Sequence, residues 1–475
     1  MQNNEINRSR IVCTFCLGYH LDVTKIEGGW YWRVVPGCDL LNMERRIILK
    51  KTSMLLFIVL SLIIATNVVG AQNIELTYWT HTDDNRTIIE NRYIEEFQAL
   101  YPNVTIKRVV NEASKMGDLM LTAFSANNAP DLFNLPIEQE YGYMMHHRVA
   151  PVNYEAIGYA NAEELVSQYM AGTFDTVMMD GQIYGLPLEL TNWSLYINKN
   201  VFRDAGLDPE KDYPKTWEEM IEVADKLTLR NGEIITRRGF DFRYPYYLVA
   251  MLPMVEQLGG QLLSDDGKTA IVNDEAWIQV FEWFRTFGPH GRNLGSPTYT
   301  SARKIFNMDN NDIGMCLTGF YQQGRIRIDN PEFYDSGEWM VVPYPVFENA
   351  VKDVRCSYYG HFMMVNAQAS AEKQYWAWKF IAYMLDHGWE YLETVNIIQP
   401  RQDLLDDPRY MELPYMDVFM TDMAKSHMVF LHENGFQFER FIKEAIESVM
   451  LSNMPSEEAL DILRERIQEV LDDSY

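Results

Sequence analysis

The sequence predicts an α/β fold divided into more than one domain, and three observations support this. Short apolar strands alternate with amphipathic helices along most of the chain, as in sheets that are covered by helices. The chain has 475 residues, which is too long for one compact core, so we expect two or three domains. The segment Gly181–Phe202 predicts two strands separated by a break, and such a segment allows the chain to cross between lobes.

The alternation of strands and helices begins after residue 72. We expect strands over Ile74–Trp79, Thr105–Val110 and Asp131–Leu135. The first intervening helix has apolar residues at helical spacing and ends before Pro102. These apolar residues are Ile89, Tyr93, Phe97 and Leu100. A second helix is expected over Lys115–Ala126.

The segment Gly181–Phe202 contains a predicted break at Pro187 and a second strand over Trp193–Asn198. The next helix is introduced by Thr216-Trp217-Glu218-Glu219, a capping box in which hydroxyl and carboxylate close the first turn reciprocally. Further helices are expected over Trp277–Phe287, Glu372–Leu385 and Ser456–Leu471, and further strands over Ile313–Gly319 and Trp339–Val342.

The N-terminal region predicts an export signal over residues 43–71. Its basic part carries Arg45, Arg46, Lys50 and Lys51. The apolar run Met54–Ala65 is short for a membrane span, and small residues precede an expected cleavage after Ala71. We therefore predict an exported, periplasmic or extracytoplasmic protein. The alternative is an uncleaved membrane anchor, whereas a lipid anchor is not expected because no Cys lies directly after the run.

Residues 1–42 precede this signal, where a signal peptide should have nothing. Since Met43 is a natural start, we interpret them as a non-native upstream extension. Cys13 and Cys16 form a C-x-x-C without a second pair at zinc spacing, so no metal site is predicted. Cys316 and Cys356 follow the signal, and two buried, unpaired thiols are favoured over one disulfide.

Charge and motifs exclude several classes of function. The net charge of −26, from 67 acidic and 41 basic residues, argues against a nucleic-acid partner, which needs clustered Lys and Arg. The sequence contains no G-x-S-x-G, no H-E-x-x-H and no phosphate loop. We therefore predict no enzyme, no catalytic residues and no cofactor.

Six segments, taken in order, resemble the family 1 extracellular solute-binding proteins, the sugar-binding components of ABC importers that include maltose-binding protein. They are Asn128–Phe133, Gly181–Phe202, Pro214–Leu227, Leu258–Gly260, Met315–Tyr321 and Trp376–Leu385. The resemblance implies a two-lobed periplasmic-binding-protein fold of type II, with about three hinge crossings and the ligand cleft between the lobes. It also implies a monomer that captures a sugar or oligosaccharide by closing its lobes and delivers it to the permease subunits in the membrane.

The resemblance also implies where the chain crosses between lobes. The crossings fall near Leu190–Trp193, Pro343–Pro345 and Ile397–Gln402. The N-lobe would then combine residues 72–190 and 346–398, and the C-lobe residues 192–343 and 402–475. Short multiple crossings suit hinge closure.

A sugar site needs directional polar groups for hydroxyls and flat aromatic rings for the C–H faces of the sugar. The chain offers both at loops that are expected to face the cleft. The candidate ligand-binding residues are Trp79, His81, Asp83, Glu138, Glu189, Asn192, Trp193, Arg243, Tyr244, Tyr246, Tyr321, Tyr358, His361 and Arg401. Glu189 and Trp193 are favoured at the first crossing, whereas Asn192 is expected to serve lobe movement.

The sequence departs from the maltose-binding pattern, because Leu135 and Tyr321 stand where that relative has stacking Trp residues. A linear maltodextrin is therefore not the expected ligand. A charged solute is the second hypothesis: Arg243 and Arg401 could hold a glycerol phosphodiester, or Glu138 and Glu189 a polyamine. The chain could also be a receptor-coupled sensor, or a secreted glycosidase, which would need two carboxylates at a defined separation.

Overall fold

The computed structural model describes residues 11–15, 19–26, 29–36, 73–232, 234–272, 274–299, 302–308 and 312–473. The chain forms two compact units, Met1–Gln72 and Asn73–Tyr475. In the first, β1 (Ile11–Phe15), β2 (Tyr19–Ile26) and β3 (Gly29–Pro36) form an antiparallel sheet. The predicted signal peptide lies outside the described residues, and the interpretation of residues 1–42 as an extension stays a prediction.

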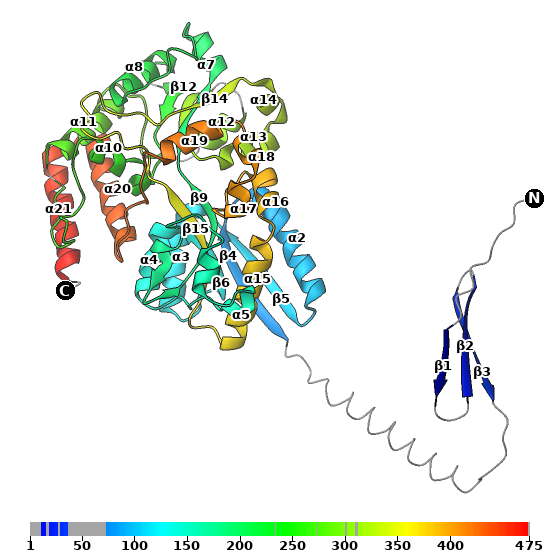
Figure 1. Cartoon of the computed structure of the whole chain (residues 1–475). Coiled ribbons are helices and arrows are strands. Elements are labelled where there is room, and N and C mark those ends of the chain that lie inside the picture. The colour runs from blue at the N-terminus through cyan, green and yellow to red at the C-terminus, as the bar shows by residue number, and fades with distance from the viewer. Residues whose placement is uncertain are drawn as a thin grey trace, which may run out of the picture. The chain divides into compact units, whose positions relative to one another are not determined.

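The second unit contains two α/β lobes, each built on its own five-stranded sheet (Figure 1). The N-lobe sheet has the order β5-β4-β6-β15-β9, with β4, β5 and β6 parallel and β15 antiparallel to both of its neighbours. Its strands are β4 (Ile74–His81), β5 (Val104–Asn111), β6 (Leu132–Pro136), β9 (Leu186–Thr191) and β15 (Tyr359–Val365). The buried faces of these strands carry the apolar positions that predicted them.

Helices and short elements complete the N-lobe. They are α2 (Asp84–Leu100), α3 (Ala113–Ser125), α4 (Ile137–Met145), α5 (Tyr154–Ile157), α6 (Ala162–Val166), η1 (Asp175–Val177), the strand pair β7 (Met178–Met179) and β8 (Gln182–Ile183), and α15 (Ala371–Leu385). The predicted face of α2 buries Ile89, Tyr93 and Phe97, whereas Leu100 is exposed at the last turn.

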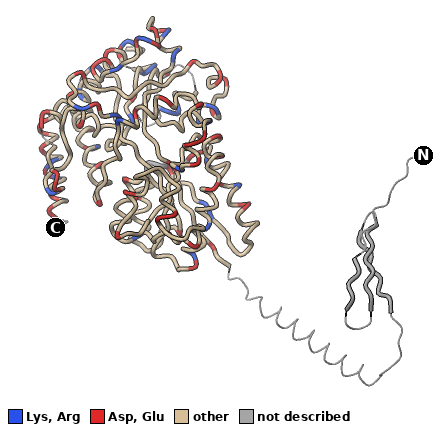
Figure 2. The backbone as a smooth tube through the Cα atoms, viewed as in Figure 1, with Lys and Arg blue, Asp and Glu red and all other residues tan. Residues whose placement is uncertain are grey.

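The C-lobe sheet has the order β11-β12-β13-β10-β14. Its strands are β10 (Ser194–Asn198), β11 (Leu229–Asn231), β12 (Ile234–Asp241), β13 (Ile313–Thr318) and β14 (Trp339–Val342). Its helices are α7 (Lys199–Asp204), α8 (Trp217–Leu227), α9 (Tyr247–Ala250), α10 (Leu252–Gln257), α11 (Glu275–Phe287), α12 (Ala302–Met308), α13 (Tyr321–Asp329), α14 (Pro331–Ser336), α19 (Met416–Met423), α20 (Gly435–Leu451) and α21 (Ser456–Asp473). Acidic and basic positions are spread over both lobes (Figure 2), so the net negative charge is not gathered in one block.

The helix α8 forms where the capping box predicts it, with one difference in its hydrogen bonds. The Thr216 hydroxyl accepts from the Glu219 N–H at 3.1 Å, as expected. The Glu219 carboxylate accepts from the N–H of Lys215 at 2.7 Å and not from that of Thr216. The hydroxyl and the carboxylate therefore both accept backbone N–H groups at the start of the helix. The N–H bound by the carboxylate belongs to the residue before the predicted one.

The first crossing joins the two sheets almost without a loop. β9 pairs with β15 in the N-lobe, β10 pairs with β13 and β14 in the C-lobe, and only Asn192 and Trp193 separate them. The predicted break at Pro187 is wrong, because Pro187 lies inside β9. β9 is the edge strand of its sheet, where a proline removes no essential ladder bond, and the register shifts beside it.

The second crossing lies later than expected. The N–H of Val346 donates to Lys215 O, that of Val351 to Gln257 O, and that of Ser357 to Val249 O, all in the C-lobe. The crossing therefore falls between Ser357 and β15, and not at Pro343–Pro345. These prolines bracket Tyr344, whose side chain is fully buried in the C-lobe.

The third crossing runs through α16 (Gly388–Glu390), the π-helical turn η2 (Tyr391–Val395), α17 (Gln402–Leu405) and α18 (Pro408–Met411). Figure 1 shows α16 and α17 between the lobes. The N–H of Gln402 still donates to Gln168 O in the N-lobe, whereas Tyr410 packs in a hydrophobic cluster of the C-lobe. Both thiols of the second unit, Cys316 and Cys356, are buried and unpaired, as predicted.

The C-lobe sheet depends on a glycine at its contact with α8. A Cβ added at Gly239 in β12 would overlap the carbonyl of Ala224 and lie 2.6 Å from its Cα. Because these are backbone atoms of a packed helix, they cannot move aside cheaply. We expect Gly239→Ala to lower the free energy of unfolding by more than about 2 kcal/mol in urea denaturation.

The matched control is Gly435→Ala, at the first position of α20. The nearest atom to a Cβ there is Glu138 O at 3.7 Å, an ordinary contact distance. This variant should change the unfolding free energy by less than about 1 kcal/mol, since alanine is the better helix former. Equal stability of the two variants would contradict the packing argument.

Candidate ligand-binding site

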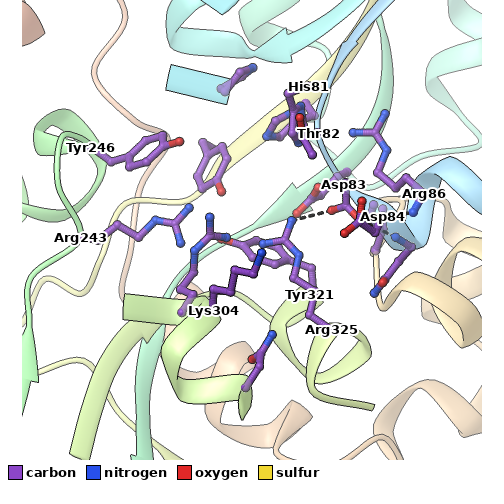
Figure 3. Close-up of a pocket in the computed structure, with 18 of the residues that line it drawn as sticks. His81, Thr82, Asp83, Asp84, Arg86, Arg243, Tyr246, Lys304, Tyr321 and Arg325 are labelled. Carbon is purple, nitrogen blue, oxygen red and sulfur yellow. Dashed lines mark hydrogen bonds and ion pairs between the residues drawn. The ribbon is translucent and has the colours of Figure 1, made fainter. Parts of the chain in front are cut away.

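A cavity of about 420 Å³ lies between the lobes and is lined from both of them. The N-lobe provides the end of β4, the start of α2 and parts of β6, β9 and β15. The C-lobe provides Arg243, Tyr246, α12 and α13. The volume lies within the range of small-molecule sites. Figure 3 shows the side chains of the two lobes directed toward one another across this space.

Part of the predicted ligand set lines this cavity. From the N-lobe these are His81, Asp83, Glu189 and His361, and from the C-lobe Arg243, Tyr246 and Tyr321. The N-lobe residues come together because β4 and β9 end at the sheet edge where the antiparallel β15 begins, and Tyr321 lies at the start of α13. The sequence pattern predicted which loops carry these residues, but it did not predict how close the residues lie to one another.

The other predicted residues lie outside the cavity lining. Trp79 is two residues before His81 on β4, away from the strand end. Asn192 donates to Phe419 O at 3.2 Å within the crossing, and the Trp193 side chain is fully buried beneath Arg243. Tyr244 is buried in the C-lobe core against Phe242, Tyr247 and Phe284.

Three further predicted residues are used elsewhere. Glu138 is buried in α4 near Glu439 of α20. Tyr358 precedes β15 and bridges to Met428, so that its neighbour Tyr359 lines the cavity instead. Arg401 forms an ion pair with Asp403 and donates to Leu385 O, far along the third crossing. Burial and local pairing, which sequence alone does not show, remove these groups from the cavity.

Several lining residues were missed by the sequence analysis. They are Arg86, Arg303, Lys304, Asn307 and Arg325. Arg86 is a structural member, because its guanidinium bonds to Glu90, Asn134 and Thr80 inside the N-lobe. Arg325 lies one helical turn after Tyr321 on α13, and this spacing could have indicated it, whereas Arg303 lies on α12, which carries no motif.

An ion pair joins the two lobes at the edge of the cavity. Asp83 caps α2 by accepting from the N–H groups of Asn85 and Arg86, and its second oxygen lies 2.5 Å from a guanidinium nitrogen of Arg325 (Figure 3). Burial raises the pKa of Asp83, but Arg325 outweighs burial and holds that pKa well below its usual value. Asp83 is therefore ionised and is satisfied from both lobes.

Two histidines form a neutral polar wall. The rings of His81 and His361 lie 5.1 Å apart between centroids. Burial and the nearby Arg86 lower the pKa of His81 to about 3. Burial, with His81 as neighbour, lowers the pKa of His361 well below its usual value, and its Nδ1 has no hydrogen-bond partner among the described residues. Neutral imidazoles present both a donor and an acceptor, which suits hydroxyl groups.

The described residues include no group of three or more His, Cys, Asp or Glu side chains that could hold a metal ion. In the same part of the chain, no helix has the length and apolar character needed to span a membrane.

Comparison with known proteins gives this cavity its context. Residues 83–391 match the family model described as bacterial extracellular solute-binding protein, which is more than half of the chain. The chain belongs to this family. The prediction that it is not an enzyme is thereby confirmed, and the glycosidase hypothesis falls away.

Among curated relatives, an arabinooligosaccharide-binding protein of Halalkalibacterium halodurans is 22% identical over 406 residues, covering 82% of each chain. A lactose-binding protein of Rhizobium radiobacter is 21% identical and covers 63% of this chain and 68% of its own. Both names describe those proteins and their ligands.

Solved structures share the fold. A solute-binding protein of Thermotoga lettingae TMO bound with alpha-D-tagatose gives a TM-score of 0.72 at 18% identity, covering 84% of this chain and 100% of its own. Maltose-bound MalE3 of T. maritima gives 0.71 at 17% identity with the same coverage. The predicted two-lobed periplasmic-binding-protein fold is therefore confirmed.

The carboxyl of Glu138 makes the stability depend on pH. Burial, with a contribution from Glu439, raises its pKa from 4.5 to about 8. Between these values the unfolded chain loses the proton and the folded protein keeps it, so this group lowers stability as pH rises. As pH rises across this window, we expect the free energy of unfolding of Glu138→Gln to increase, relative to that of the native protein, by about 1.4 kcal/mol per pH unit.

The measurement is urea denaturation of both proteins at several pH values from 5 to 8. The control is Glu163→Gln, because Glu163 is exposed on α6, and it should keep the pH dependence of the native protein. A constant difference between Glu138→Gln and the native protein over the whole range would show that Glu138 does not titrate with a raised pKa.

Proposed function

We propose that this protein is the extracytoplasmic solute-binding component of an ABC importer and that it captures a sugar or oligosaccharide. The observation that carries the proposal is the cavity between the lobes, with aromatic rings and neutral hydrogen-bonding groups on facing walls. Tyr246 and Tyr321 supply flat apolar faces, and the two histidines supply donors and acceptors. The printed names of several relatives, which include arabinooligosaccharide and lactose binding, support a saccharide.

The proposed ligand contacts are the predicted residues that line the cavity, His81, Asp83, Glu189, Arg243, Tyr246, Tyr321 and His361. Glu189 suits this role because burial raises its pKa to about 7 although Arg86 and Arg325 oppose the effect. Near neutral pH its carboxyl can therefore donate or accept a hydrogen bond to a sugar hydroxyl.

The proposed mechanism involves no bond chemistry. The open protein binds the solute, the lobes close about the crossings, and the closed form docks as a monomer on the permease. A ligand shifts this equilibrium only through contacts that differ between the two states. Export through the predicted cleaved signal peptide would deliver the protein to the periplasm or another extracytoplasmic site, consistent with its family.

The runner-up is a binding protein for a charged small solute. The arginines of the cavity favour an anionic solute over a polyamine, since a polycation would be repelled by Arg243, Arg303 and Arg325. A related fold with a TM-score of 0.68, UgpB of Mycobacterium tuberculosis, was solved in complex with glycerophosphocholine.

Tyr321 tests the aromatic wall. Its ring lies at the start of α13 and lines the cavity. We expect Tyr321→Ala to weaken binding of a sugar found by thermal-shift screening by roughly 2 kcal/mol, about 30-fold, because a stacking face is lost. Isothermal titration calorimetry measures the change. The control is Tyr375→Ala on α15, outside the cavity, which should bind the sugar as tightly as the native protein does. If Tyr321→Ala also bound the sugar as tightly as the native protein, Tyr321 would not belong to the site.

Lobe closure has its own measurement. Small-angle X-ray scattering of the purified protein should give a smaller radius of gyration with the saturating sugar than without it. A radius that stays constant at saturation, with binding proven by calorimetry in the same buffer, would count against closure as the mechanism.

A further inference from the structure

Cationic side chains gather on the C-lobe wall of the cavity around Tyr321. The guanidinium carbons of Arg325 and Arg303 lie 4.7 Å and 5.7 Å from the centroid of the Tyr321 ring. That of Arg243 lies 4.1 Å from the ring of Trp193 and 4.7 Å from that of Tyr246. Figure 3 shows Arg243, Lys304 and Arg325 extending into the same space.

These cations differ in whether a carboxylate balances them. Arg325 is paired with Asp83 at 2.5 Å, and Arg86 with Glu90 at 2.8 Å. Within the described part of the chain, no carboxylate lies within ion-pair distance of Arg243 or Arg303. The Nε and Nη1 atoms of Arg243 are also buried without any hydrogen-bond partner there. Buried donors on a cation are costly unless something pairs with them.

The carboxylates that line the cavity compensate these two arginines only in part, through Glu189, whose ionised form is favoured by Arg243. Asp83 is engaged by Arg325, and Asp84 and Asp329 are exposed to solvent. Glu189 is buried in β9, and its pKa is raised to about 7 by burial. The charge on the C-lobe wall is therefore positive, in a protein whose net charge is −26.

Neighbouring groups respond to this positive field. Burial raises the pKa of Tyr321, but Arg243, Arg303 and Arg325 outweigh it and bring the pKa down to about 8. Burial and the proximity of Arg243 lower the pKa of Arg303 to about 10. Both shifts mean that a negative charge placed beside these residues would be stabilised.

We infer that the solute carries an oxyanion, a carboxylate or a phosphate, attached to a sugar, and that Arg243 and Arg303 bind it. The guanidinium fork matches both oxyanions in bidentate geometry and gives direction as well as charge. The ring of Tyr246 remains available to pack against the sugar ring. The neutral histidines on the N-lobe wall remain available to bind the sugar hydroxyls. This inference rests on the proposed function and specifies its ligand class.

The experiment is isothermal titration calorimetry on the full purified chain with matched probes. Digalacturonate is compared with galactobiose, and glucose 1-phosphate with glucose. We expect at least one acidic probe to bind more than about tenfold tighter than its neutral match, with an affinity that falls as sodium chloride is raised. The carboxylate and phosphate pairs identify which oxyanion is preferred.

Two variants locate the anion site. Arg243→Gln and Arg303→Gln should each weaken the acidic probe at least about tenfold, and weaken it more than the neutral match. Arg203→Gln, which removes an exposed arginine of α7 that pairs with Glu338 outside the cavity, should leave both affinities unchanged. Thermal denaturation of each variant without ligand checks that the fold is retained.

The outcomes separate the two proposals. If neutral probes bind as tightly as their acidic matches, or if Arg243→Gln and Arg303→Gln keep the native preference, the oxyanion inference is overturned and sugar binding stands. If no member of a wider panel of neutral and acidic saccharides binds, both the inference and the proposed function fail.

Discussion

The first crossing, Asn192–Trp193, is the constraint on which the rest of the structure depends. These two residues join a strand of each sheet, so the two sheets follow one another almost without a loop. Trp193 is fully buried at this crossing, and its indole N–H donates to the Tyr359 hydroxyl at the second crossing, 3.2 Å away. The same ring lies under Arg243. One side chain thus connects two crossings and supports the floor of the cavity.

The cavity follows from this arrangement as a region where both lobes present unsatisfied polar groups. The N-lobe wall is made of groups that are neutral or already paired: His81, His361 and Asp83. The C-lobe wall contributes arginines that have no carboxylate of their own among the described residues. Buried arginines without a carboxylate are costly in the empty protein. A bound anion would neutralise them, so the proposed ligand would supply the missing negative charge. The Asp83–Arg325 pair shows how a carboxylate of one lobe balances an arginine of the other.

The element pattern was largely predictable because it depends on local periodicity. The buried faces of α2, α8 and α21 follow the apolar spacing of the sequence. The break predicted at Pro187 was wrong because a proline is tolerated in an edge strand, and edge position is a property of the whole sheet. The second crossing was misplaced for a similar reason, since residues 346–357 are held by hydrogen bonds to distant segments of the C-lobe.

The sequence by itself determined the α/β alternation, the family and the loops that converge on the cleft, because these are encoded in short-range patterns and ordered motifs. Only the tertiary structure decided which side chains reach the cavity. Glu138, Tyr244 and Tyr358 have the right chemistry but are buried or turned elsewhere, whereas Arg303 and Arg325 belong to helices without a signature. The physical reason is that burial and charge pairing arise between segments far apart in the chain, and those contacts set both the direction of a side chain and the charge it can offer a ligand.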